Sequence, residues 1–210
     1  MAMRASLLLL LFCCLCNQSF PQGAADDDAN RVIKSPDDLG RKIFRAIQNN
    51  RYKQAKNASA LVLTQKDMKN IGHDLIKMIE RKIEGGTYQD PADGHAMIGG
   101  IRSTFLNEEE IKKQFAKFEQ EEKILKKSFF DIHASAKKHG FNWSQTKHLR
   151  TDSSQIKPDK HVPLPMGDLY IHFTADNREF RIKLPNCANP PKIGWLMDSD
   201  PLSLEIVKTK

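Results

Sequence analysis

The feature that most constrains the fold of this chain is an alternating pattern on both sides of Asp176-Asn177. The residues from 167 to 187, GDLYIHFTADNREFRIKLPNC, read as two strands joined by a two-residue turn, because short polar residues between apolar runs are typical of hairpins. Antiparallel pairing across this turn predicts apolar pairs on one face: Phe173 with Phe180, Ile171 with Ile182, and Leu169 with Leu184. The other face would pair Thr174 with Glu179, His172 with Arg181, and Tyr170 with Lys183. A slip of one residue would move every apolar side chain to the wrong face, so the pattern specifies one register.

Three further segments extend the predicted sheet. Residues 192–197 offer a third strand with Ile193, Trp195 and Met197 on its apolar side, and a turn at residues 198–201 leads to a last strand in which Leu202, Leu204 and Ile206 alternate. Before the hairpin, residues 147–151 form a weak, polar strand of the kind found at a sheet edge.

The N-terminal half has the 3.6-residue period of helices. Ser35-Pro36-Asp37-Asp38 is a helix start, because Ser35 can cap, proline suits the first helical position and carboxylates favour the positive end of the helix dipole. Apolar stripes then predict a first helix ending at Asn49-Asn50, a short second helix, and a third between Thr64 and Gly85. The stripes consist of Leu39, Ile43, Phe44 and Ile47; of Tyr52, Ala55, Ala58 and Leu61; and of Met68, Ile71, Leu75 and Ile79.

Residues 87–105 have no clear period and contain Gly94, Gly99 and Gly100. Long connections of this kind are often functional, and the glycines match neither a phosphate-binding loop nor a dinucleotide fingerprint. We therefore expect a surface loop, with a lid over a cleft as the alternative.

Asn107 starts the longest predicted helix and Gly140 ends it. Acidic residues crowd its first turn and basic residues its last, as the helix dipole favours. Its apolar stripe consists of Ile111, Phe115, Phe118, Leu125, Phe129 and Ile132. Helices first and antiparallel strands after them indicate an α+β fold, with N-terminal helices and one long helix packed on a C-terminal antiparallel sheet of about four strands.

The first 25 residues are predicted to be a signal peptide. One basic residue, Arg4, precedes the apolar run LLLLLFCCLC, which is too short to span a bilayer. Cleavage is expected between Cys16 and Ala25, and lipoprotein anchoring or an uncleaved anchor are the alternatives. Residues 26–34 would form a flexible acidic leader, and residues 35–210 a single domain with a helical part (35–140) and a sheet part (141–210). The mature protein is thus expected to be secreted or periplasmic, without a transmembrane segment.

Signal cleavage changes the charge and the thiol content. It lowers the formal net charge from +7 to +6, since Arg4 is the only charged residue removed, and it leaves Cys187 as the only cysteine. An exported protein with one thiol has no internal disulfide framework, so its stability must come from its core. We interpret Cys187 as a small buried residue at a strand end rather than a reactive thiol.

Four segments together resemble a group of uncharacterised exported bacterial proteins. They are AKKHGFNWSQ (136–145), GDLYIHFT (167–174), REFRIKLPNC (178–187) and KIGWLMD (192–198). The usual pattern of that group has a long helix ending in Lys-x-x-Gly-hydrophobic-x-Trp-Ser, and strands with Asp-hydrophobic-Tyr and Gly-Lys-Trp motifs. This chain differs in having Ile193-Gly194-Trp195 at the last motif, and in its Asp176-Asn177 turn. The resemblance implies an architecture similar to cystatin-like and nuclear-transport-factor-like cone folds, in which a curved sheet wraps a helix. It implies export but no catalytic residue.

Motifs for catalysis or metal binding are missing from the sequence. It has no HExxH, no paired cysteines after the signal and no Gly-x-Ser-x-Gly elbow, and its seven histidines are scattered. Asp198 and Asp200 could hold a hard cation but suit a turn better. The sequence therefore predicts no cofactor, no metal and no nucleic-acid partner, and it leaves the oligomeric state open.

The candidate ligand-binding residues lie on the polar side of the hairpin: Tyr170, His172, Arg181 and Lys183. Two fixed cations beside an imidazole and an aromatic ring make a plausible anion-binding surface, although a solvated basic face is the simpler interpretation.

Two function classes stay open. The first is an exported, non-catalytic module that binds a protein or an anionic polymer. The second is a small cone-fold enzyme with a pocket between the sheet and the long helix. An interior filled with apolar side chains would favour the binding module. A hollow interior that contains His172 would favour the enzyme.

Overall fold

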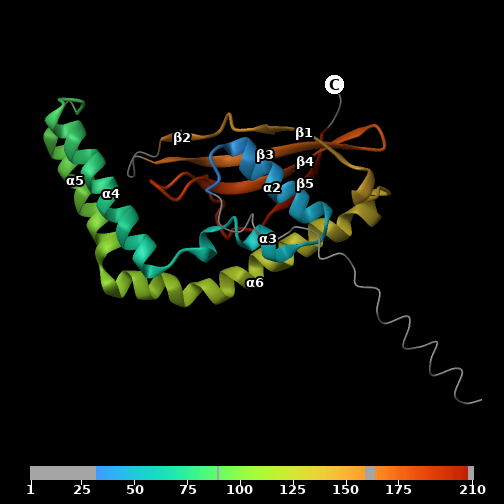
Figure 1. Cartoon of the computed structure of the whole chain (residues 1–210), viewed down its shortest axis with the longest axis horizontal. Coiled ribbons are helices and arrows are strands. Elements are labelled where there is room, and N and C mark those ends of the chain that lie inside the picture. The colour runs from blue at the N-terminus through green and yellow to red at the C-terminus, as the bar shows by residue number, and fades with distance from the viewer. Residues whose placement is uncertain (1–31, 89, 159–163, 208–210) are drawn as a thin grey trace, which may run out of the picture. The chain divides into compact units, whose positions relative to one another are not determined.

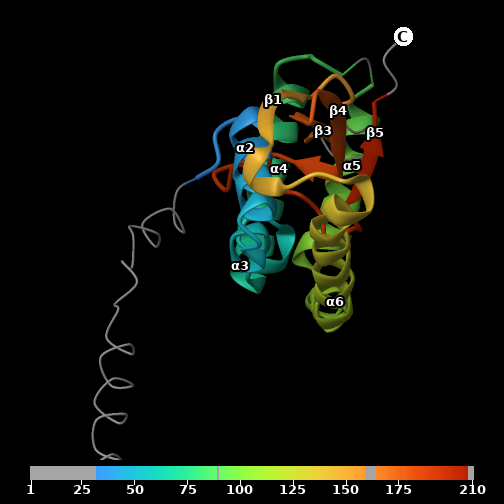
Figure 2. The same cartoon turned by 90° about the vertical axis from the view of Figure 1, so that its right-hand side faces the viewer.

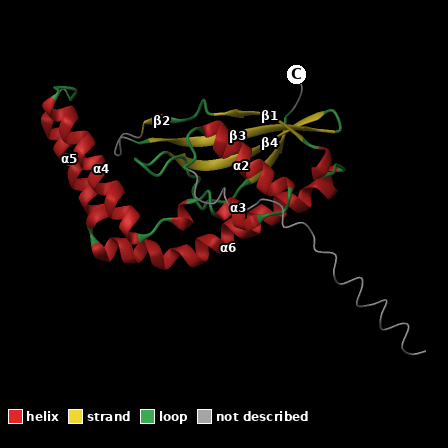
Figure 3. Cartoon of the chain, in the orientation of Figure 1, coloured by secondary structure: helices red, strands yellow, loops and turns green. Residues whose placement is uncertain are grey.

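The computed structural model describes residues 32–88, 90–158 and 164–207. Helices occupy the N-terminal part of this range and an antiparallel sheet the C-terminal part, so the predicted α+β class is confirmed (Figure 1, Figure 3). The predicted signal peptide and all but the last three residues of the predicted leader lie outside the described residues.

The helical part consists of five α-helices and three shorter turns in the described residues. The α-helices are α2 (Pro36–Gln48), α3 (Tyr52–Lys56), α4 (Gln65–Glu84), α5 (Pro91–Ile101) and α6 (Glu108–His139). The shorter turns are η2 (Ala60–Val62), the π-helical η3 (Arg102–Leu106) and η4 (Trp143–Gln145). The predicted short second helix is split, because α3 ends at Lys56 and Leu61 lies in η2.

The predicted starts of α2, α4 and α6 and the predicted end of α6 are confirmed. The Ser35 hydroxyl accepts from the backbone N–H of Asp38 at 3.1 Å, and Thr64 forms a reciprocal capping box with Asp67. The Asn107 side chain accepts from two backbone N–H groups at the start of α6. Gly140 ends α6 with a φ of 72°, in the left-handed region that favours glycine.

The prediction of an irregular loop over residues 87–105 is wrong. This segment contains α5, which the side chain of Asp90 caps by accepting from the backbone N–H of Ala92. Ile98 and Ile101 are buried in a cluster that also contains residues of α4. The glycines lower intrinsic helix propensity, but burial of these two isoleucines overrides it.

The sheet contains five strands: four lie in the order β1-β3-β4-β5, and the two-residue β2 pairs with β3 beyond β1. The strands are β1 (Lys147–Asp152), β2 (Lys157–Pro158), β3 (Pro165–Ala175), β4 (Arg178–Ala188) and β5 (Ser203–Ile206). All six cross-strand pairs predicted for the hairpin occur between β3 and β4. Asp176 and Asn177 have φ values of 47° and 59°, as a hairpin turn with two left-handed residues requires.

The predicted third strand over residues 192–197 is wrong. Only isolated bridges occur there, between Ala188 and Leu196 and between Ser59 and Met197. Lys192 and Gly194 have positive φ values of 63° and 91°, which interrupt an extended backbone. Trp195 and Met197 are nevertheless buried, as the apolar pattern predicted.

The last residues of the predicted leader belong to the folded domain. Ile33 is 8% exposed, and its carbonyl accepts a 2.9 Å hydrogen bond from the backbone N–H of Trp195. The prediction that the flexible leader reaches residue 34 is therefore wrong at Ile33.

The main core lies between the apolar face of the sheet and the helices. In Figure 2, α3 and α6 lie on the same side of the strands. Phe44 of α2 packs on Phe173 of β3, with ring centroids 5.5 Å apart, and Phe129 of α6 belongs to the same buried cluster. A second, smaller cluster joins α4, α5 and Leu164. The buried residues of α6 are Ile111 near its start and a group from Leu125 onward. Between them, the aromatic rings of Phe115 and Phe118 are half-buried, and their centroids lie 4.6 Å apart.

Candidate functional site

The four predicted ligand-binding residues lie together on one face of the hairpin. Tyr170 is paired with Lys183, and His172 with Arg181, on adjacent strands. The guanidinium carbon of Arg181 lies 4.7 Å from the centroid of the Tyr170 ring, which is a cation–π contact. Three of the four side chains are half-buried, whereas His172 is only 5% exposed.

Both cations of this group have a carboxylate partner. Arg181 binds Glu205 of β5 at 2.6 Å, and Lys183 binds Asp168 at 2.6 Å. The hydrogen bond to Asp168 raises the pKa of Lys183. Burial pushes the pKa of Asp168 upward, but hydrogen bonds from Lys183 and from the backbone N–H of Asn186 outweigh it, and the pKa is lowered.

The imidazole of His172 is held by Glu179, and Arg150 binds the same carboxylate. Nδ1 of His172 lies 2.7 Å from Oε1 of Glu179, and the Arg150 guanidinium lies 3.2 Å from both atoms. An ionised carboxylate can only accept a hydrogen bond, so Nδ1 carries the hydrogen and donates it to Glu179. This arrangement fixes the orientation of the imidazole ring.

Sequence reasoning missed most of the partners of these residues. Glu205 is in a strand whose register could not be read from its short pattern, and Arg150 is in an edge strand with a bulge between His148 and Arg150. Alternation along the strands places two partners on this face: Glu179, which was predicted to pair with Thr174, and Asp168, two residues before Tyr170. We name the assembled surface the polar face; it consists of Arg150, Asp168, Tyr170, His172, Glu179, Arg181, Lys183 and Glu205.

The pairing changes what the polar face can bind. Its three permanent cations, Arg150, Arg181 and Lys183, each lie within 3.2 Å of a carboxylate oxygen on the same face. An anionic polymer would have to compete with these internal partners. The polar face therefore carries paired positive and negative charges rather than charges of one sign.

The opposite face of the sheet is filled by its own side chains. Phe173 and Phe180 stack with centroids 5.5 Å apart, Phe141 lies 4.9 Å from Phe180, and Trp143 lies 5.3 Å from Phe173. Each of these four side chains is at most 8% exposed. His172 lies on the polar side of the sheet, and no aromatic contact joins it to this interior in the described part of the chain.

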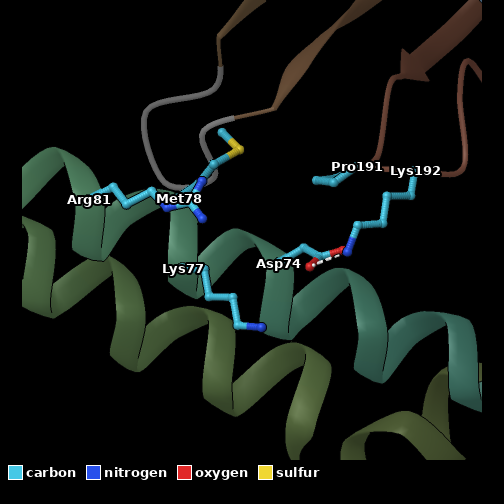
Figure 4. A pocket seen from close by; sticks show the side chains of 6 residues that line it. All are labelled: Asp74, Lys77, Met78, Arg81, Pro191 and Lys192. Carbon is cyan, nitrogen blue, oxygen red and sulfur yellow. Dashed lines mark hydrogen bonds and ion pairs between the residues drawn. The ribbon is translucent and has the colours of Figure 1, made fainter.

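A pocket of about 290 Å³ lies between α4 and the turn that follows β4 (Figure 4). Asp74, Lys77, Met78 and Arg81 line it from α4, while Pro191 and Lys192 line it from the turn. The ammonium of Lys192 binds the Asp74 carboxylate at 2.8 Å across the pocket. None of these six residues belongs to the polar face.

Cys187 is fully buried at the end of β4, as the sequence predicted. Burial raises the pKa of its thiol above the usual value, so the reactive thiolate is disfavoured.

Within residues 32–88, 90–158 and 164–207, no group of three or more His, Cys, Asp or Glu side chains could hold a metal ion. Over the same residues, every helix is too short or too polar to cross a membrane.

Comparison of the chain with protein-family models, with curated proteins and with solved structures finds no match in any of the three. The resemblance to exported bacterial proteins with a cone fold stays a prediction.

Proposed function

We propose that the protein is an exported, non-catalytic binding module, and that a partner protein docks on its polar face. The observation that carries this proposal is the contrast between the two faces of one sheet. The apolar face is occupied by the aromatic core of the protein itself. The polar face carries oriented, partly exposed charged groups, with Arg150 at 58% side-chain exposure and Arg181 at 40%.

The charge arrangement favours a protein over an anionic polymer. Each permanent cation on the polar face alternates with a carboxylate, which complements a protein surface of mixed charge better than a uniformly negative chain. Tyr170 stacked under Arg181 adds the residue types that are enriched in protein interfaces. The alternative of a cone-fold enzyme requires space between the sheet and α6, where Phe129 and Phe180 are fully buried.

The docking surface is tested with three forms of the full chain: wild type, the variant Arg181→Glu with Lys183→Glu, and the control Lys123→Glu with Lys127→Glu. The control makes the same charge change on exposed positions of α6, where both lysines are paired with carboxylates as Arg181 and Lys183 are. Each form is immobilised and exposed to extracellular proteins of the source cell, and separately to heparin as an anionic polymer. We expect one protein to bind wild type and control but not the polar-face variant.

Two results would overturn the docking proposal. One is recovery of the same proteins by all three forms, which would exclude the polar face. The other is heparin binding that only the polar-face variant loses, without any protein that behaves in the same way.

Export is tested separately by N-terminal sequencing of the secreted product. The proposal expects a first residue between Asn17 and Asp26, because the apolar run ends at Cys16 and small residues follow it. A secreted product that begins at Met1 would contradict cleavage.

A further inference from the structure

The pocket beside α4 has an excess of positive charge. Lys77, Arg81 and Lys192 line it together with a single carboxylate, Asp74. Lys192 already binds that carboxylate at 2.8 Å. Among the described residues, Lys77 and Arg81 form no ion pair, so two cations remain for a ligand.

The surroundings of Asp74 favour negative charge. The hydrogen bond from Lys192 lowers the pKa of Asp74, and the charges of Lys77 and His73 act in the same direction. One carboxylate is thus surrounded by positive groups from both sides of the pocket. A second anionic group placed near Lys77 and Arg81 would be attracted by these two cations.

The opposite wall is built by a tight turn. The backbone N–H groups of Ile193 and Gly194 both donate to the carbonyl of Pro190, at 3.2 and 3.3 Å. Lys192, directly before Ile193, has a φ of 63°, a conformation that a residue with a side chain adopts infrequently. The turn directs the Lys192 side chain across the pocket to Asp74 and leaves Pro191 as an apolar lining residue (Figure 4).

The remaining lining is apolar. Met78 is half-buried on α4, one residue from Lys77 and three from Arg81, and Pro191 lies on the other wall. Residues four apart on a helix are neighbours on its surface, so Lys77 and Arg81 can contact one anionic group together. The pocket therefore combines two adjacent cations with an apolar lining.

We propose that this pocket binds a small organic anion, whose phosphate or carboxylate group contacts Lys77 and Arg81 and whose apolar part packs on Met78 and Pro191. A volume of about 290 Å³ suits a molecule with a short apolar chain rather than a large cofactor. The site does not depend on docking at the polar face, since the two share no residue.

The test is a calorimetric titration of the full chain with three probes: hexyl phosphate, hexanoate and, as the uncharged analogue, hexanol. The pocket variant is Lys77→Gln with Arg81→Gln. The matched control is Lys66→Gln with Lys82→Gln, which removes the same charge from exposed positions of the same helix outside the pocket. Melting curves of both variants verify that the fold is retained, as expected for exposed positions.

We expect saturable binding of hexyl phosphate or hexanoate by the wild-type chain, at least about tenfold tighter than that of hexanol. The pocket variant should weaken this binding by about tenfold or more, and the control variant should leave it within about twofold. Preference for one of the two anions identifies the phosphate or the carboxylate as the natural group. Absence of saturable binding to the wild-type chain, equal losses in both variants, or hexanol binding as tight as anion binding would each overturn the proposal.

Discussion

Ile182 and Lys183 are neighbours on β4 with opposite surroundings. Ile182 is fully buried against the core, whereas the Lys183 side chain is 34% exposed and binds Asp168 on the polar face. Ile182→Asp should lower the free energy of unfolding by about 3–5 kcal/mol, because it places an unpaired charge in the core. Lys183→Gln removes a partly exposed ion pair and should cost at most about 1 kcal/mol. Urea unfolding of both variants measures the difference, and equal losses would mean that the two faces of the hairpin are misassigned.

Cys187 should make stability depend on pH in the alkaline range. Its thiol has a raised pKa in the folded chain, whereas in the unfolded chain it ionises near pH 9. The unfolded chain therefore loses a proton that the folded chain retains, and the stabilisation present below pH 9 is lost as pH rises above it. By pH 10 the loss should be about 1.4 kcal/mol.

The variant Cys187→Ala isolates this effect. Its free energy of unfolding should be lower than that of the wild type at pH 8, because a small cavity replaces the sulfur. Between pH 8 and pH 10 it should decline less than the wild type does. Parallel declines in the two proteins would show that the thiol is not the titrating group.

At the scale of elements, α5 offers a direct test of its helical state. A Cβ atom added at Gly99 or Gly100 would meet nothing within 4 Å. Glycine in a helix interior costs about 0.5–1 kcal/mol relative to alanine, so Gly99→Ala and Gly100→Ala should each raise the free energy of unfolding by that amount.

The control for this test is Gly72→Ala on α4. There the added Cβ would lie 2.7 Å from Cβ of Phe105, too close for a real contact. This substitution should be destabilising because the two segments must move apart. A gain at Gly72, or no gain at Gly99 and Gly100 in thermal melts, would contradict the packing of α4 on η3 or the helical state of α5.

The elements differ in how far the sequence predicts them. The hairpin was predictable pair by pair, because Asp176-Asn177 fixes the turn and the period of two fixes the faces. Residues 91–101 were not, since Gly94, Gly99 and Gly100 remove the local helix signal and only tertiary burial of Ile98 and Ile101 restores it. Residues 192–197 show the reverse case: the apolar alternation is real, but Lys192 and Gly194 turn the backbone away from the sheet.

The candidate site was predictable only in part, because some of its contacts join residues that are distant in the sequence. Alternation along β3 and β4 placed Tyr170, His172, Arg181 and Lys183 together, because these strands are adjacent in sequence and in space. Their carboxylate partner Glu205 comes from β5, whose alignment depends on the whole sheet. In the pocket beside α4, Asp74 contacts Lys192, which is 118 residues away in the sequence. No local sequence pattern predicts such a contact.

At the scale of the whole molecule, the hairpin turn has a consequence for the order of folding. Two residues separate β3 from β4, so this pairing costs little loop entropy and forms on a time scale of about 1–10 μs. By contrast, the side chain of Gln48 in α2 donates to the carbonyl of Trp143 across 95 residues. Contacts this distant in sequence form slowly, so α2 should dock after the hairpin is in place.

Folding and unfolding rates of two conservative variants test this order. Ile171→Val in β3 should slow folding, with a ratio of barrier change to stability change of about 0.5–0.8. Ile43→Val in α2 should chiefly speed unfolding, with a ratio of about 0–0.3. Both isoleucines are fully buried, so the same methyl group is lost from equivalent surroundings. The opposite ranking would mean that the N-terminal helix, rather than the hairpin, organises the transition state.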